Sequence, residues 1–162
     1  MRAVLITGPP GSGKTSVLEA LVDALSDDDV PHAALEVEAV VWTHPALDDD
    51  ARLRHVRVNC ALLRKAGPEV LLVADTVETE GELARLIEAV DADEAFVVRL
   101  RAEPDTLAER IIAREPPRWS GLAALVAHAR AMAPVPGADL ELSTDGQAAE
   151  DVAAQIRKTA RL

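Results

Sequence analysis

The sequence predicts an α/β protein in which a parallel sheet is covered by helices on both faces. Segments with strand-like and helix-like patterns alternate along the whole chain, and this alternation is typical of parallel strands joined by crossover helices. The run "EVLLVAD" is the most apolar of the sequence, as expected for a central strand buried on both faces. Because 162 residues suit one hydrophobic core, we expect a single domain over residues 1–162.

Three strands are expected in the first half of the chain, at 2–7, near 33–38 and at 69–75. The first is a β-branched apolar run that ends at Gly8. Apolar residues then recur at helix spacing, so helices are expected over about 14–25 and 53–63. The second of these helices follows an acidic cluster, which favours a helix N-terminus, and ends before Gly67 and Pro68.

The second half is expected to hold strands at 95–101 and 139–144 and helices at about 81–90, 104–115, 121–133 and 148–161. Pro104 suits the first turn of a helix, and the stretches "PPRW" and "PVPG" interrupt the chain on either side of the helix that follows. We expect the Ser120 side chain to cap that helix. The sequence contains no internal repeat, and no long linker lies between these elements.

Charge and cysteine content exclude several classes of function. The formal net charge of −11 repels nucleic-acid phosphates and anionic lipids, so we expect neither nucleic acid nor a membrane as a partner. Cys60 is the only cysteine, which excludes an internal disulfide, and no Cys/His cluster suggests structural zinc. We expect Cys60 in the core and a cytoplasmic protein without a signal peptide, present as a monomer or homodimer.

The most specific motif is a glycine-rich loop that follows a strand and begins a helix. It fits the pattern G-x-x-x-x-G-K-[ST], in which backbone N–H groups and the helix N-terminus hold phosphate oxygens. We expect Lys14 to reach the β- and γ-phosphates of ATP and the Thr15 hydroxyl to bind Mg²⁺. The alternative is a glycine turn without a ligand. The predicted nucleotide-binding residues of the loop are Gly8, Pro9, Pro10, Gly11, Ser12, Gly13, Lys14, Thr15 and Ser16.

Four segments together resemble a known family: the glycine loop, the pair Glu36 and Glu38, the stretch "LAERIIARE", and "LSTDGQAAEDVAAQI" near the end. They are similar to small P-loop kinases of the nucleoside-monophosphate-kinase-like group, which includes adenylate, shikimate and gluconate kinases and chloramphenicol phosphotransferase. The resemblance implies a three-layer P-loop NTPase fold whose five-stranded parallel sheet has the order 2-3-1-4-5. It also implies a short lid at about 114–120. No single member of the group is matched.

Two arginines at helical spacing are candidates for catalysis. Arg110 and Arg114 share a helix face, and Arg118 lies in the expected lid. The resemblance implies that Arg110 packs on the adenine and that Arg114 meets the phosphates, where both stabilise transition-state charge. The alternative is a solvated helix face with ion pairs to Glu109 and Glu115.

Three acids are candidates for the metal and the acceptor. Glu36 and Glu38 stand two apart on the expected second strand, so their side chains share one side of the sheet. By resemblance Glu36 is the metal-side acid, and Glu38 binds the acceptor hydroxyl or acts as general base. Asp75 ends the apolar strand, where it either binds Mg²⁺ through water or caps a turn. We expect the following Thr76 and Glu78 to face the same cleft as Asp75. The alternative for Glu36 and Glu38 is that both carboxylates are simply solvated.

Other residues carry two interpretations each. The resemblance places the loop of Thr144, Asp145 and Gly146 along the base edge, but ordinary turn chemistry explains Asp-Gly equally well. Trp42 and His44 either contact an acceptor or serve as core filler and turn residue. Arg52, Arg54 and Arg57 either offset the acids at 48–50 and the overall acidity or point one arginine into the cleft toward an anionic acceptor. We expect His128 to be a surface residue.

The sequence therefore predicts an enzyme, a kinase that uses ATP and Mg²⁺ to phosphorylate a small-molecule acceptor. The acid pair favours a hydroxyl acceptor over a nucleoside monophosphate, since arginines would dominate a phosphate-binding acceptor pocket. The alternative is a nucleotide hydrolase or switch that acts through a protein partner. A GTPase is disfavoured, because the fourth strand is followed by "AEPD" and not by an Asn-Lys-x-Asp guanine reader.

Overall fold

A computed structural model describes residues 1–162. The strands are β1 (Arg2–Thr7), β2 (His32–Glu36), β3 (Val70–Ala74), β4 (Glu94–Arg101) and β5 (Leu140–Ser143). The helices are α1 (Lys14–Asp27), α2 (Val37–Val40), α3 (Asp49–Arg64), α4 (Glu80–Val90), α5 (Pro104–Arg114), α6 (Leu122–Ala131) and α7 (Ala149–Ala160). None of these helices combines the length and the apolar character that a membrane span requires.

The five strands form one parallel sheet in the order β2-β3-β1-β4-β5, as expected. All five residues of β3 are buried, and so are five of the six residues of β1. Successive side chains of these strands point to opposite faces, so each strand contributes to two separate cores. This explains why "EVLLVAD" lacks the alternation of a strand with one solvated face.

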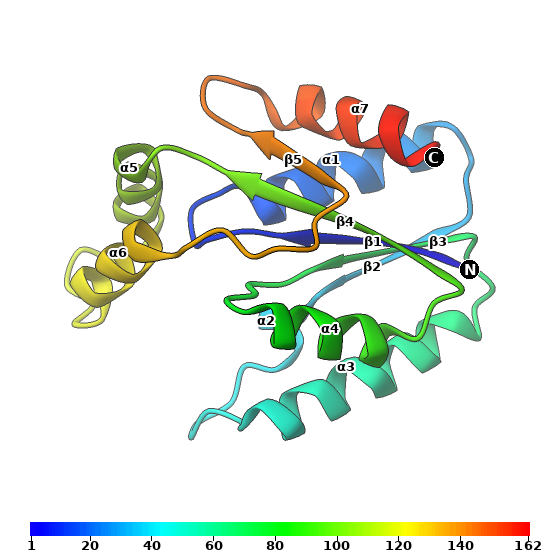
Figure 1. Cartoon of the computed structure of the whole chain (residues 1–162), viewed down its shortest axis with the longest axis horizontal. Coiled ribbons are helices and arrows are strands. Elements are labelled where there is room, and N and C mark those ends of the chain that lie inside the picture. Colours follow the sequence, from blue (N-terminus) through cyan, green and yellow to red (C-terminus); the bar gives the residue numbers. More distant parts are fainter.

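Helices cover both faces of the sheet (Figure 1). One core lies between the sheet and the pair α3 and α4, and the other lies between the sheet and the pair α1 and α7. A third and much smaller cluster joins α5 to α6 through Leu107, Ile111 and Ala129. These two helices stand beyond the carboxyl ends of the strands (Figure 1), where the ligands of open parallel sheets bind.

Two expectations about individual elements are wrong. The second strand ends at Glu36, because its only neighbour, β3, ends at the paired Ala74. Beyond that pair no strand residue is available for backbone hydrogen bonding. The chain turns there into α2, with Val37 fully buried and Glu38 in the first turn, so Glu36 and Glu38 do not share a strand face. Ser120 does not cap α6, whose N-cap is Gly121 without a side-chain hydrogen bond.

Candidate active site

The phosphate loop connects β1 to α1 and takes a shape that only glycine allows at two positions. Gly13, the N-cap of α1, has a φ of 92°, in the left-handed region. Gly8 has a φ of 146°, and a Cβ there would collide with the carbonyl oxygen of Leu100 on β4. The loop therefore lies close against the sheet, and the unpaired N–H groups of the first turn of α1 face the ligand side.

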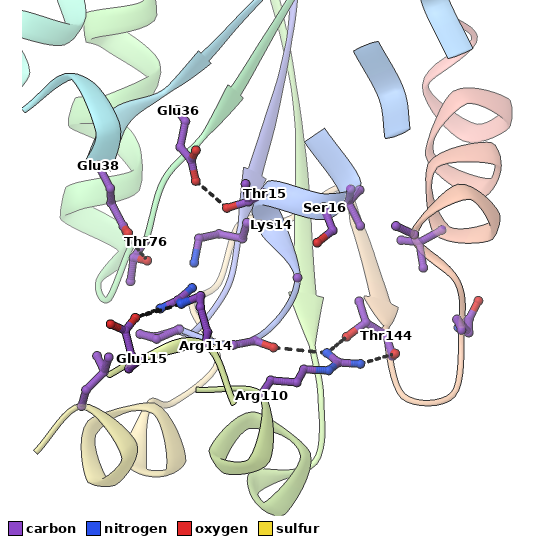
Figure 2. Close-up of a pocket in the computed structure, with 18 of the residues that line it drawn as sticks. Lys14, Thr15, Ser16, Glu36, Glu38, Thr76, Arg110, Arg114, Glu115 and Thr144 are labelled. Carbon is purple, nitrogen blue, oxygen red and sulfur yellow. Dashed lines mark hydrogen bonds and ion pairs between the residues drawn. The ribbon is translucent and has the colours of Figure 1, made fainter. Parts of the chain in front are cut away.

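A cavity of about 900 Å³ lies at this loop and is large enough for a nucleotide together with a small molecule. Glu36, Glu38 and Thr76 lie on one side of Lys14, and Arg110 and Thr144 lie on the other (Figure 2). The predicted site residues that line it are Pro10, Gly11, Gly13, Lys14, Thr15, Ser16, Glu36, Glu38, Arg110, Arg114 and Thr144. The predicted ones outside its lining are Gly8, Pro9, Ser12, Asp75, Asp145 and Gly146.

Lys14 projects from the start of α1 into this cavity. Its Nζ donates to the carbonyl oxygens of Gly8 at 3.0 Å and Pro9 at 3.3 Å, which holds the ammonium over the loop. Burial lowers the pKa of Lys14 below its usual value, although nearby carboxylates, that of Glu38 first, oppose the shift. A bound phosphate would supply the negative charge that this buried ammonium favours.

Thr15 and Glu36 form the best candidate for binding Mg²⁺. The Thr15 hydroxyl donates a hydrogen bond to the Glu36 carboxylate at the carboxyl end of β2 (Figure 2). No group of three or more His, Cys, Asp or Glu side chains is placed to hold a metal through protein ligands alone. Mg²⁺ in phosphoryl-transfer sites is held by one or two protein oxygens together with phosphates and water. The donor set therefore fits a metal that arrives with a nucleotide.

Asp75 follows β3 and is engaged by an arginine. Its carboxylate forms a buried ion pair with Arg52 of α3 and accepts a hydrogen bond from the Thr76 backbone at 2.9 Å. Burial raises the pKa of Asp75 to about 6, against the opposing effect of Arg52. The expectation that Arg52 offsets the acids at 48–50 is wrong, because Arg52, in the first turn of α3, pairs with Asp75. A metal role for Asp75 stays a prediction.

Arg110 connects three parts of the site. Its guanidinium donates to the Gly11 carbonyl oxygen at 3.2 Å and to both the hydroxyl and the carbonyl oxygen of Thr144 at 2.8 Å (Figure 2). The Thr144 hydroxyl in turn donates to the Ser12 carbonyl oxygen at 3.0 Å. This network joins α5 and the end of β5 to the phosphate loop, and Glu109 takes no part in it.

The second arginine lies nearer the opening of the cavity. Arg114 forms an ion pair with the adjacent Glu115 at 2.8 Å, and its positive charge is close enough to disfavour that of Lys14. Arg118, in the loop between α5 and α6, is exposed and does not line the cavity. The contact of Arg110 with adenine and that of Arg114 with phosphates stay predictions.

The side of the cavity opposite Arg110 and Thr144 is built from segments that are distant in sequence. The Thr76 hydroxyl donates to the Glu38 carboxylate at 2.7 Å (Figure 2), which brings together two residues that were expected in one cleft. His128 of α6 also lines the cavity, with Nε2 3.1 Å from the Glu78 carboxylate. His128 is exposed, as expected; its place in the cavity lining was not predicted from the sequence.

Other predicted residues lie away from the cavity. Trp42 is 93% exposed, so it is not core filler, and it does not line the cavity. The Asp145 carboxylate accepts hydrogen bonds from the Glu103 backbone at 3.0 Å and the Ser143 hydroxyl at 2.9 Å. Asp145 thereby performs ordinary turn chemistry, and the reading of a base by residues 144–146 stays a prediction. Cys60 is 1% exposed in the core, as expected.

A family model described as an AAA domain (AAA_18) matches residues 4–119, which is most of the chain. The chain belongs to this AAA domain family. The matched part of the AAA domain begins in β1 and ends in the loop after α5, so it contains the phosphate loop, Glu36, Glu38 and both arginines. No curated protein matches the chain.

Solved structures share the fold of this AAA domain over nearly its whole length. The APS kinase of Mycobacterium tuberculosis, in complex with AMPPNP and APS, is 17% identical with a TM-score of 0.73, covering 99% of this chain and 98% of its own. A sugar kinase of Janibacter sp. HTCC2649 is 18% identical with a TM-score of 0.70, covering 99% and 95%. A gluconokinase of Sinorhizobium meliloti 1021 is 19% identical with a TM-score of 0.64, covering 98% and 95%. The AAA domain thus has the P-loop kinase fold that its sequence resembles.

Proposed function

We propose that this AAA domain protein is a small-molecule kinase that transfers the γ-phosphoryl group of ATP to an acceptor hydroxyl. One observation carries the proposal: a single cavity of about 900 Å³ joins the phosphate loop to a second polar compartment with Glu38, Thr76 and His128. A nucleotide on the loop fills only part of this space. The similar solved structures named above as kinases of a sugar, of gluconate and of APS support the proposal by analogy of fold.

The nucleotide side of the site is suited to phosphoryl transfer. The N–H groups of the loop and of α1 bind the phosphates, and Lys14 and Arg114 stabilise the charge that develops on the transferred group. Thr15 and Glu36 would hold Mg²⁺, which neutralises phosphate charge when bound. Glu36 is the better metal-side acid, because it contacts Thr15, whereas Asp75 is paired with Arg52.

The acceptor side is suited to a hydroxyl. Its oxygen attacks the γ-phosphorus, the bond from phosphorus to the bridging oxygen of ADP breaks, and the hydroxyl proton passes to the Glu38 carboxylate. Thr76 fixes that carboxylate through its hydrogen bond of 2.7 Å. A nucleoside monophosphate acceptor is disfavoured, because the compartment of Glu38, Thr76 and His128 contains a carboxylate and no arginine.

Acceptor-dependent release of ADP tests the proposal. We expect ATP consumption to rise only when one member of a panel of sugars, antibiotics, nucleotides and small acids is added. Lys14→Ala should lower this turnover at least about 100-fold, because it removes a charge that acts on the transition state. Lys158→Ala, on the exposed side of α7, is the matched control and should leave it unchanged. Hydrolysis at one rate with and without every acceptor would instead identify a hydrolase or switch.

A further inference from the structure

We propose that the acceptor is a hydroxyl compound without negative charge, either neutral or cationic. The inference rests on the proposed function and names its substrate class. The observation that carries it is the division of charge within the cavity: the cationic side chains are committed to the phosphate loop or to acidic partners, whereas the acceptor compartment presents the Glu38 carboxylate (Figure 2).

The lining of the cavity contains three basic side chains besides His128, those of Lys14, Arg110 and Arg114. Lys14 donates to carbonyl oxygens of the loop, and Arg110 donates to Gly11 and Thr144 on the nucleotide side. Arg114 is paired with Glu115. The phosphates of ATP would use the remaining charge of these groups, so none is left to compensate an anionic acceptor.

Two further groups next to the acceptor compartment have a positive or potentially positive charge, and both are engaged. Arg52 pairs with Asp75, whose carboxylate is 2% exposed. If Arg52 turned to an anionic acceptor, that buried carboxylate would lose its partner, which is strongly unfavourable. His128 lies 3.1 Å from the Glu78 carboxylate, so any charge on its ring is already balanced.

Glu38 is the group that an acceptor would meet. It accepts one hydrogen bond, from Thr76, and forms no ion pair, so its carboxylate retains capacity for further donors. Hydroxyl and ammonium groups supply such donors. A carboxylate, sulfate or phosphate on the acceptor would face Glu38 without a compensating cation. The net charge of −11 adds a field that repels anions from the whole molecule.

Three probes with the same six-carbon polyol chain test this inference: sorbitol, 1-amino-1-deoxysorbitol and gluconate, with charges of 0, +1 and −1 at pH 7. The ¹⁵N-labelled protein, saturated with Mg²⁺ and the non-hydrolysable AMPPNP, is titrated with each probe. Amide shifts of Glu38, Thr76 and His128 then report the dissociation constants. We expect gluconate to bind at least 10-fold more weakly than the amine and more weakly than sorbitol.

A variant links that difference to one carboxylate. Glu38→Gln should lower the ratio of the gluconate dissociation constant to the amine dissociation constant at least threefold. Glu19→Gln, at an exposed position of α1, should leave this ratio unchanged. Tightest binding of gluconate, or equal behaviour of the three probes, would overturn the inference. Amide shifts of residues 8–16 on addition of AMPPNP report the phosphate site separately. Their absence would contradict the proposed function, whereas a preference for gluconate with these shifts present would contradict the substrate class alone.

Discussion

Lys14 carries its charge where burial disfavours it. The position is advantageous only when phosphates arrive, because a buried ammonium gains from a nearby anion far more than an exposed one does. The two carbonyl oxygens that it contacts hold it in place without neutralising it. The buried position thus favours the charged form of Lys14 only when a phosphate is bound nearby.

A proton-linkage measurement follows from this. Because burial lowers the pKa of Lys14 and phosphates raise it again, binding of Mg²⁺ and AMPPNP should take up protons, increasingly as the pH rises toward the lowered pKa. Calorimetric titrations in two buffers with different ionisation enthalpies measure this uptake. In Lys14→Met the alkaline component should disappear, while Lys158→Met should retain it. Proton release on the alkaline side would contradict the pKa shift.

The predictability of single residues depends on how local their partners are. The place of the phosphate loop between β1 and α1 was predicted, since one octapeptide between a strand and a helix carries the motif. The pairing of Asp75 with Arg52 was missed, because the two lie 23 positions apart and no periodicity connects them. His128 was missed because its role depends on how α6 packs against α5.

At the scale of elements, the error at the end of β2 has a physical origin. The letters "EVEAV" suit a strand through their alternation and a helical turn equally well. What decides is the neighbouring strand β3, whose ladder ends at Ala74, opposite Glu36. The resulting helix α2 moves Glu38 away from Glu36 and toward Thr76, and it thereby separates the acceptor side from the metal side of the site.

The Thr144 hydroxyl adds two hydrogen bonds to the connection between α5, the end of β5 and the phosphate loop. Thr144 is 4% exposed, accepts from Arg110 and donates to Ser12. Thr144→Val keeps the shape but leaves a buried donor and a carbonyl oxygen without partners. The free energy of unfolding in urea should fall by about 1–3 kcal/mol, and AMPPNP affinity should weaken as well. Thr159→Val, on the exposed side of α7, should change stability by no more than about 0.5 kcal/mol.

In the whole molecule, the strand order brings the glycine loop and Arg110 into contact at one end of the sheet. β1 lies in the middle of the sheet, so its carboxyl end receives elements from β2 and β3 on one side and from β4 and β5 on the other. Alternation of strands and helices was enough to predict a parallel sheet covered on both faces, whereas its strand order was implied by the resemblance to small P-loop kinases. The acceptor compartment was harder to predict, because Glu38, Thr76 and His128 come from three separate elements that only the folded chain brings together.

Cys60 gives a probe for the stability of this whole arrangement. It is the single cysteine, lies in the core on the buried face of α3 with 1% exposure, and has a pKa that burial raises to about 11. Reaction with a thiol reagent at pH 8 therefore requires opening of that core. Because the folded pKa of Cys60 is raised, its contribution to stability is complete below the unfolded pKa of about 9 and is lost as the pH rises toward 11.

The labelling rate of Cys60 should also respond to nucleotide, which does not contact it. A ligand that binds only the folded state reduces the open population by the factor 1 + [L]/Kd, so about 100-fold slower labelling is expected at 100 times the dissociation constant. Mg²⁺ with AMPPNP should produce this protection in the native protein and much less in Lys14→Ala. Labelling at the rate of the urea-unfolded chain would contradict the buried position of the thiol. Labelling that nucleotide leaves unchanged, with Cys60 still protected, would argue against nucleotide binding at the loop.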